Sequence, residues 1–219
     1  MVRHHRRAHL RFVDLAFVND ACKGVIRLLV AEHGPEVVEV HRKEPIQPWM
    51  LHAWLSLPDG ARVGPYIVGD NLPWLGVRVF IALAATSGFR KADMALDPKI
   101  AFSMMHLSLR FVGYRFDGVD YACPTLALLL AVNMCTYCFV RPPPSKADFD
   151  GSRYGQSPIC SRYHPTAPVN LCRELVRYEI ARGLLTPEER RLAPLLLNAK
   201  GACWRKQALA DFFRILCLC

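Results

Sequence analysis

Apolar residues recur along this chain with a helical period in some stretches and a strand period in others. Residues 21–34, 46–57 and 73–87 carry apolar side chains at helical spacing, so each range is predicted to form a helix. Residues 58–72 contain Gly, Pro and Asp at turn-forming positions and are predicted to form a loop. A short helical segment is expected over residues 89–96.

The middle of the chain changes to the strand period. Residues 106–112 alternate between apolar and polar side chains, which predicts a strand. Residues 132–141 and 155–162 are two further predicted strands. Residues 142–151 are expected to form the loop between them, because three consecutive prolines cannot join a sheet ladder and Asp-Gly favours a turn.

The C-terminal part returns to the helical pattern. Asn170 is placed to cap a helix that Gly183 would end, and Thr186-Pro187-Glu188-Glu189 is a capping box for the next helix. The last predicted helix carries an apolar face on Leu209, Phe212, Phe213 and Leu216 that runs on toward Cys219. Such a face needs a partner, so the chain is expected to be cut off at its C-terminal end.

These elements predict an α+β fold that is mainly helical with a small antiparallel β-sheet. Two parts are expected. Residues 1–40 form a basic helical lead-in or linker, and residues 41–219 form the main domain.

The charge balance changes the choice of partners. The chain has 219 residues, and 28 Lys and Arg against 19 Asp and Glu give a net charge of +9. Such a balance favours a polyanion, either nucleic acid or an anionic membrane, although a basic protein without such a partner stays an alternative. Residues 121–140 lack charges and are long enough to span a membrane, but Pro124, Asn133 and the strand formers favour a buried helix followed by a strand. No membrane partner is therefore predicted.

The nine cysteines indicate reduced thiols in an intracellular protein, because no secretory signal peptide precedes them. Cys135-Thr136-Tyr137-Cys138 suggests a metal, but a zinc site needs four ligands, and the chain has no second Cys-x-x-Cys and no paired histidines at workable spacing. Buried free thiols are favoured instead. No metal and no small-molecule cofactor are predicted.

Two basic residues are candidates for phosphate chemistry. Arg90 follows a predicted apolar helix and Gly88, and a firmly mounted guanidinium is suited to clamp a phosphate with two parallel hydrogen bonds. Asp93 lies on the same helical face and would orient it, unless the two form an ordinary surface pair. Lys146, on the loop between two predicted strands, would reach a DNA groove or protonate a leaving oxygen, unless it is a solvated lysine.

These residues lie in two segments that resemble motifs of one family. Thr86-Ser87-Gly88-Phe89-Arg90-Lys91-Ala92-Asp93 resembles the first motif of the tyrosine recombinases, the phage-integrase family. Ser145-Lys146-Ala147-Asp148 resembles the β-hairpin lysine segment of the same family. The residues of the two segments are most similar to those of recombinases from eukaryotic mobile elements, such as Cryptons and tyrosine-recombinase retrotransposons. The resemblance covers about residues 40–216, so it implies that residues 41–219 form a partial tyrosine-recombinase catalytic domain.

The resemblance implies roles for individual residues. Arg90 would be the first phosphate-clamping arginine, and Lys146 would contact DNA and assist departure of the 5′ oxygen. Lys91 and Arg141 are predicted to add DNA contacts. In the family, a His-x-x-Arg motif and a tyrosine nucleophile complete the site. Neither is recognised after Lys146: the remaining histidine and tyrosines there do not match, and these are His164, Tyr154, Tyr163 and Tyr178.

The resemblance thus implies a DNA-binding fragment of a recombinase that takes part in DNA integration and recombination but cannot cleave alone. Whether the chain is itself an enzyme stays open. Double-stranded DNA is the expected partner, with self-association on DNA as a further option, and the expected location is with DNA inside the cell, in the nucleus if the host is eukaryotic. The alternative is a non-catalytic basic module that binds DNA or protein, with Arg90 and Lys146 as ordinary surface residues.

Overall fold

The computed structural model describes residues 48–87, 89, 91–133, 136–144 and 158–217, together with Leu28, Ala31 and Glu32. The chain divides between Pro45 and Ile46, and the second unit contains the elements described below. Leu28, Ala31 and Glu32 are helical and belong to the first unit. The rest of the predicted helix at 21–34 lies outside the described residues.

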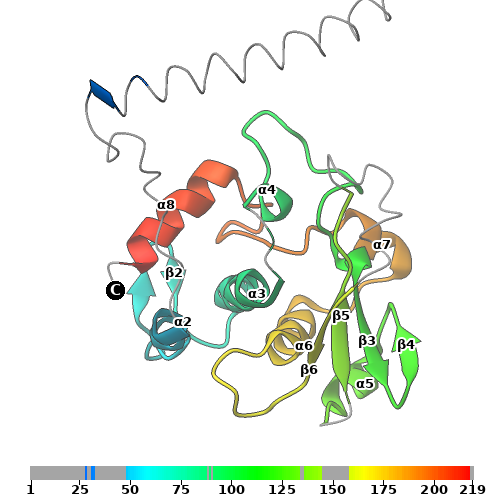
Figure 1. Ribbon diagram of the computed structural model, residues 1–219. Helices are drawn as coiled ribbons and strands as arrows, with labels where there is room; N and C mark the ends of the chain where they lie inside the picture. Colours follow the sequence, from blue (N-terminus) through cyan, green and yellow to red (C-terminus); the bar gives the residue numbers. More distant parts are fainter. Residues whose placement is uncertain are drawn as a thin grey trace, which may run out of the picture. The chain divides into compact units, whose positions relative to one another are not determined.

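A long apolar helix, α3 (Leu72–Ser87), runs through the middle of the second unit (Figure 1). It is buried on almost every side, as expected for a helix without a polar face. Asn71 starts it by accepting a hydrogen bond from the Trp74 amide at 3.1 Å. The predicted helices at 46–57 and 73–87 are confirmed, the first as α2 (Pro48–Leu55).

One side of α3 is closed by α8 (Lys206–Leu216), the last helix of the chain. Its apolar face packs on aromatic rings: the Phe213 ring centroid lies 5.1 Å from that of Phe80, and the Phe212 centroid lies 5.0 Å from that of Tyr66. The partner that this apolar face needs is therefore supplied by α3 and the segment around Tyr66.

Tyr66 belongs to a small hairpin in the range predicted to be a loop. The strands β1 (Arg62–Val63) and β2 (Tyr66–Ile67) pair antiparallel across a turn in which Gly64 has a φ of +57°. Strands of two residues are too short to show a period in the sequence.

The opposite side of the unit is a four-stranded antiparallel sheet with the order β4-β3-β5-β6. Its strands are β3 (Val112–Phe116), β4 (Val119–Tyr121), β5 (Tyr137–Val140) and β6 (Ile159–Arg162). The last two confirm the predicted strands at 132–141 and 155–162 in shorter form.

The predicted strand at 106–112 is wrong. Leu109–Phe111 forms a 3₁₀ turn, η2, and the sheet begins only at Val112. The alternating pattern has a different cause, because Leu107 and Leu109 are buried against the segment that follows α7. Their backbones bond that segment directly: the Leu109 amide donates to Ala193 O at 3.0 Å, and the Leu195 amide donates to Leu107 O at 3.1 Å.

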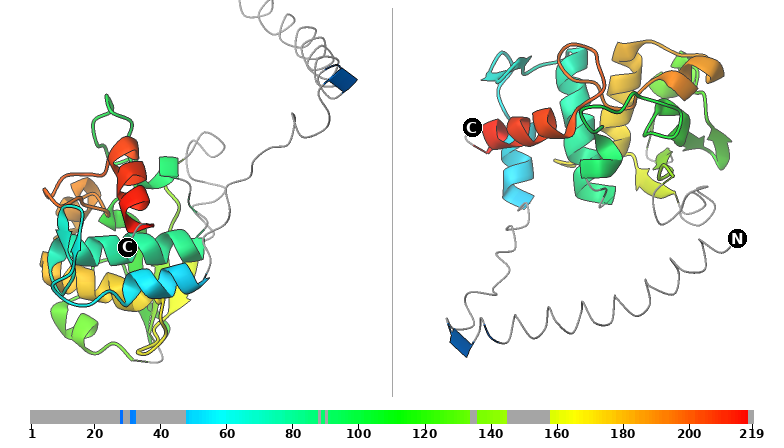
Figure 2. Two further views of the ribbon diagram at one scale, coloured as in Figure 1. Left: turned by 90° about the vertical axis from the view of Figure 1, so that its left-hand side faces the viewer. Right: turned by 90° about the horizontal axis from the view of Figure 1, so that it is seen from above.

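Two helices with predicted caps complete the unit. α6 (Leu171–Arg182) is capped by Asn170 and ends at Gly183, and it lies between α3 and the sheet (Figure 1). Both views of Figure 2 show α3 and α6 side by side. α7 (Pro187–Leu192) has the full capping box at Thr186 and Glu189. These predictions are confirmed.

Two short helices occupy the remaining predicted positions. α4 (Lys91–Met94) falls within the predicted segment 89–96. α5 (Leu126–Leu130) and β5 divide the uncharged stretch 121–140, as expected. Within the described part of the chain, no helix has the length and apolar character needed to cross a membrane. The α+β fold, with a small antiparallel sheet among helices, is confirmed.

Candidate nucleic-acid interface

The two faces of the four-stranded sheet differ sharply. On the inner face, Val112, Tyr114 and Cys138 are buried, and Tyr114 bonds Glu179 of α6. Successive side chains of a strand point to opposite faces, so the intervening residues point away from α6. We call that side the outer face. Its residues include Gly113, Arg115, Asp120, Tyr137, Phe139, Cys160 and Arg162.

The outer face contains a hollow of about 400 Å³. We call it the outer hollow. It is lined by Arg115, Asp120, Tyr137, Phe139, Arg141, Pro158 and Cys160. The lining residues come from all four strands or their ends, and the basic and aromatic side chains among them belong to β3, to β5 and to the residue that follows β5.

Phe139 lies across Gly113 on the neighbouring strand. A Cβ atom added to Gly113 would come within 2.2 Å of Cζ of Phe139, so the ring rests on the glycine backbone. On the ring itself, the guanidinium carbon of Arg141 lies 5.3 Å from the centroid. Phe139 is only 7% exposed. It therefore belongs to the floor of the hollow, and Arg141 lies above it.

An ion pair forms the rim of the outer hollow. Nε of Arg115 donates to Oδ1 of Asp120 at 2.6 Å, and Nη2 donates to Oδ2 at 2.9 Å. These hydrogen bonds lower the pKa of Asp120 below its ordinary value, so the pair is ionised at neutral pH. Both side chains remain accessible to solvent. Next to them, the guanidinium carbon of Arg162 lies 5.6 Å from the Tyr137 ring centroid.

Of the predicted site residues, Arg141 lies in this hollow and is exposed. Lys146 lies outside the described residues, but its flanks are placed. β5 and β6 are adjacent antiparallel strands, with Val140 opposite Ile159, so the segment that carries Lys146 connects two neighbouring strands as predicted. Arg141 and Pro158 line the hollow at the two ends of that segment.

Arg90 also lies outside the described residues, and its neighbours are well anchored. Phe89 packs against the core, and its amide donates to Oγ of Ser87 at 3.1 Å. On the other side, Leu96 is buried, and its amide donates to Trp204 O at 2.9 Å. The two flanks of Arg90 are therefore both held by the core.

The two other candidate residues of that motif, Lys91 and Asp93, lie in α4. Asp93 is half-buried there, and Lys91 is the first residue of the helix, although its side chain is not described. α4 packs against α8. Among the side chains that the structure describes, Arg141 lines the outer hollow and Asp93 does not.

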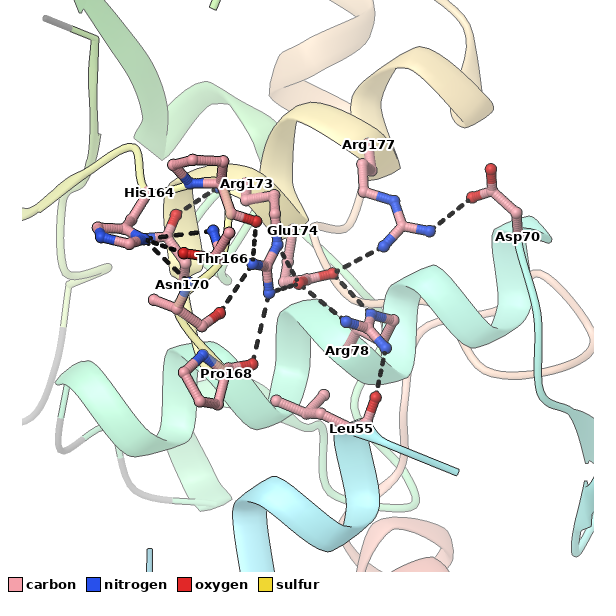
Figure 3. Close-up of polar contacts among 12 residues, drawn as sticks. Leu55, Asp70, Arg78, His164, Thr166, Pro168, Asn170, Arg173, Glu174 and Arg177 are labelled. Atoms are coloured by element: carbon pink, nitrogen blue, oxygen red, sulfur yellow. Dashed lines mark hydrogen bonds and ion pairs between the residues drawn. The ribbon is translucent and has the colours of Figure 1, made fainter. Parts of the chain in front are cut away.

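Several other arginines lie in a buried network at the junction of α3 and α6 (Figure 3). Glu174 accepts hydrogen bonds from Nε of Arg78 at 2.7 Å and from Nη2 of Arg173 at 2.8 Å. Nη1 of Arg173 also donates to Ala167 O at 2.7 Å, and Nη1 of Arg78 donates to Leu55 O at 3.0 Å. Arg78 and Arg173 thus use their donors inside the fold, which makes them unsuitable as phosphate clamps.

The remaining candidates have structural explanations. Nδ1 of His164 accepts the Ala167 amide at 2.9 Å and shapes the loop before α6. Tyr178 is a buried residue of α6, so its role is in packing. Cys138 is a buried free thiol whose pKa is raised by burial, whereas Cys135 lies outside the described residues. Within the described ranges, no three His, Cys, Asp or Glu side chains gather as metal ligands would.

The sequence patterns predict only Arg141 among the residues that line the outer hollow. No role is predicted from the sequence for four of the other lining residues, which are Arg115, Asp120, Tyr137 and Phe139. A usable signal exists in Asp117-Gly118, because this dipeptide favours the tight hairpin turn that joins β3 to β4 and sets Asp120 opposite Arg115.

Comparison of the chain with models of protein families, with curated proteins and with solved structures finds no match. The resemblance to the tyrosine recombinases therefore stays a prediction from the two motifs.

Proposed function

We propose that this chain binds DNA through the outer face of its four-stranded sheet. The observation that carries the proposal is the outer hollow, in which Arg115 and Arg141 meet the rings of Tyr137 and Phe139. Exposed arginines are the usual contacts to phosphate oxygens, and the net charge of +9 favours the same partner.

The position of the β5–β6 connection supports this proposal. The segment leaves the sheet at Arg141 and returns at Pro158, and both residues line the hollow. A lysine on that connection, Lys146, would be near any DNA that lies on the outer face. The resemblance to the recombinases likewise implies that a lysine on a β-hairpin contacts DNA.

The recombinase part of the proposal rests on the two motifs. Arg90 would clamp a phosphate, supported by the anchoring of Phe89 and Leu96 on either side of it. Asp93 and Lys91 would orient it and add a contact. Self-association on DNA belongs to the same proposal. Strand cleavage by this chain is not proposed, because the residues after Lys146 contain neither a His-x-x-Arg motif nor a matching tyrosine.

Fluorescence anisotropy with a labelled duplex tests the proposal. The full chain is expected to bind tightly at low salt and to lose affinity steeply as salt rises. Arg141→Ala should weaken binding and reduce the salt slope by about 1, as expected for the loss of one phosphate contact. Arg214→Ala is the matched control, because Arg214 is an exposed arginine of α8, away from the sheet. Absence of binding at low salt would overturn the proposal.

The same assay separates the recombinase proposal from the alternative of a plain interaction module. Arg90→Ala and Lys146→Ala should each weaken duplex binding if these residues contact phosphates. If both variants bind as the unmodified chain does, the two motifs have no role in DNA binding. An apolar surface on Ile100, Met104 and Met105, which are all exposed, would then be the place to look for a protein partner.

A further inference from the structure

We propose that the outer hollow receives an unpaired base of the bound nucleic acid, with the phosphate beside that base held by Arg115 and Arg141. This inference rests on the proposed DNA binding and specifies which part of the nucleic acid the site recognises.

The aromatic floor is the first reason. Tyr137 and Phe139 lie in the same strand and point to the same face, and Tyr137 is partly accessible from the hollow. Aromatic rings bind unpaired bases by stacking, whatever the base, because every base has a flat π face. A base inside a duplex is already stacked on its neighbours and cannot offer that face. The floor of the hollow therefore fits an unpaired base.

The size of the hollow is the second reason. Its volume of about 400 Å³ lies near the lower end of the range of roughly 300–1,000 Å³ that is typical of small-molecule sites. A single nucleotide is a ligand of that class. A double helix is too wide to enter a hollow of this size, so a duplex would lie over the rim.

The charge on the rim is the third reason. Arg115 and Arg141 both line the hollow. The carboxylate of Asp120 accepts two hydrogen bonds from the Arg115 guanidinium, which a ligand would otherwise receive. A phosphate would have to displace the carboxylate of Asp120 from Arg115. The exchange is feasible because the Arg115–Asp120 pair is solvent-accessible, with side chains 53% and 43% exposed. Asp120 is therefore expected to weaken anion binding at this site.

The test uses the full chain and two labelled probes. One is a fully paired duplex. The other has the same sequence with a single unpaired 2-aminopurine, whose fluorescence falls when the base stacks on an aromatic ring. Affinity is measured by anisotropy and stacking by 2-aminopurine emission. The unmodified chain should prefer the unpaired probe and should quench it.

Two variants act in opposite directions. Tyr137→Leu should weaken binding to the unpaired probe by about fivefold or more and abolish quenching, with little effect on the paired duplex. Asp120→Asn should tighten binding, because Arg115 is released to the phosphate. Asp211→Asn is the matched control, since it removes the same charge from another exposed pair, Arg214–Asp211, on α8.

The outcomes separate the two proposals. If the chain binds both probes equally and does not quench 2-aminopurine, this inference is wrong and the proposed DNA binding stands. If Asp211→Asn tightens binding as much as Asp120→Asn does, the effect is one of net charge and the assigned site is wrong. If neither probe binds at low salt, the proposed function fails and this inference fails with it.

Discussion

The inner and outer faces of the four-stranded sheet use the same kinds of side chain in opposite ways. On the inner face, Glu179 is bonded by Arg190 and accepts a hydrogen bond from the Tyr114 hydroxyl at 3.0 Å. The side chains of Arg190 and Glu179 are 2% and 3% exposed. Arg190 also donates to Leu109 O and to Val112 O. This cluster is closed to solvent and to any ligand.

On the outer face, an arginine, an acid and a tyrosine again lie together, as Arg115, Asp120 and Tyr137. Here the ion pair is open to water. Burial, and not the number of arginines, therefore decides which arginines are available to a polyanion. Removing one partner of a buried pair leaves a charge without compensation, whereas a solvent-accessible pair exchanges partners readily.

The largest expected effect is the loss of the inner acid. Glu179→Ala should lower the free energy of unfolding by about 3–5 kcal/mol, because the Arg190 charge stays buried without its partner. Chemical denaturation followed by circular dichroism measures this change. The matched variant on the outer face is Asp120→Ala, which removes an acid from an arginine that water can reach. It should leave the unfolding midpoint unchanged. If Glu179→Ala and Asp120→Ala lower the free energy of unfolding equally, the contrast between the two faces is wrong.

The second prediction concerns pH and the network around Glu174 (Figure 3). Burial by itself would raise the pKa of Glu174, but the hydrogen bonds and charges of Arg78 and Arg173 outweigh it and lower the pKa below its ordinary value of 4.5. The stabilisation by this carboxylate is therefore fully present above about pH 4.5 and is lost as the pH falls through the lowered pKa.

Glu174→Gln should accordingly cost about 1.5–3 kcal/mol at neutral pH, as expected for weakened hydrogen bonds to charged groups. In acid the unmodified chain loses the same contribution, so the difference between the two proteins should shrink. Denaturation curves at neutral pH and well below pH 4.5 measure the difference in unfolding free energy between the two proteins under each condition. If this difference in unfolding free energy is as large in acid as at neutral pH, the charge of Glu174 is not the source of its stabilising effect.

The long elements of the fold are predictable from the sequence, because their signals are local. α3 follows from an unbroken apolar period, and the caps at Asn170 and Thr186 mark the starts of α6 and α7. β1, β2 and β4 were missed, since strands of two or three residues show no period. The prediction of a strand at 106–112 failed although its alternating pattern is real. The segment pairs with the residues after α7 and not with the sheet.

The outer hollow was harder to predict because it depends on register. Arg115 lies opposite Tyr137, and Gly113 lies opposite Phe139, only because β3 and β5 pair in one alignment. A single sequence does not specify that alignment, although it predicts that the segment carrying Lys146 connects two neighbouring strands. The assignment of Arg90 and Lys146 to phosphate contact stays a prediction from their motifs.

The smallest expected effect concerns Gly113, where the hollow can be changed without changing a charge. In Gly113→Ala the added methyl group would overlap the Phe139 ring, whose Cζ lies 2.2 Å from the Cβ position. The ring must move, and we expect a loss of about 1–3 kcal/mol in the free energy of unfolding, typical of overpacking. Gly76→Ala is the matched control, since the nearest atoms to its Cβ position, Leu197 O and Cε2 of Tyr178, both lie 3.4 Å away.

Gly113→Ala should also remove the preference for a probe with an unpaired base, because the displaced ring no longer forms the floor of the hollow. Gly76→Ala, in the buried α3, should keep both stability and preference. A Gly113→Ala chain that is as stable as the unmodified one would show that Phe139 does not rest on this glycine. A destabilised but folded chain that still prefers the unpaired probe would instead place base recognition outside the outer hollow, and the functional difference between the two faces would have to be sought elsewhere.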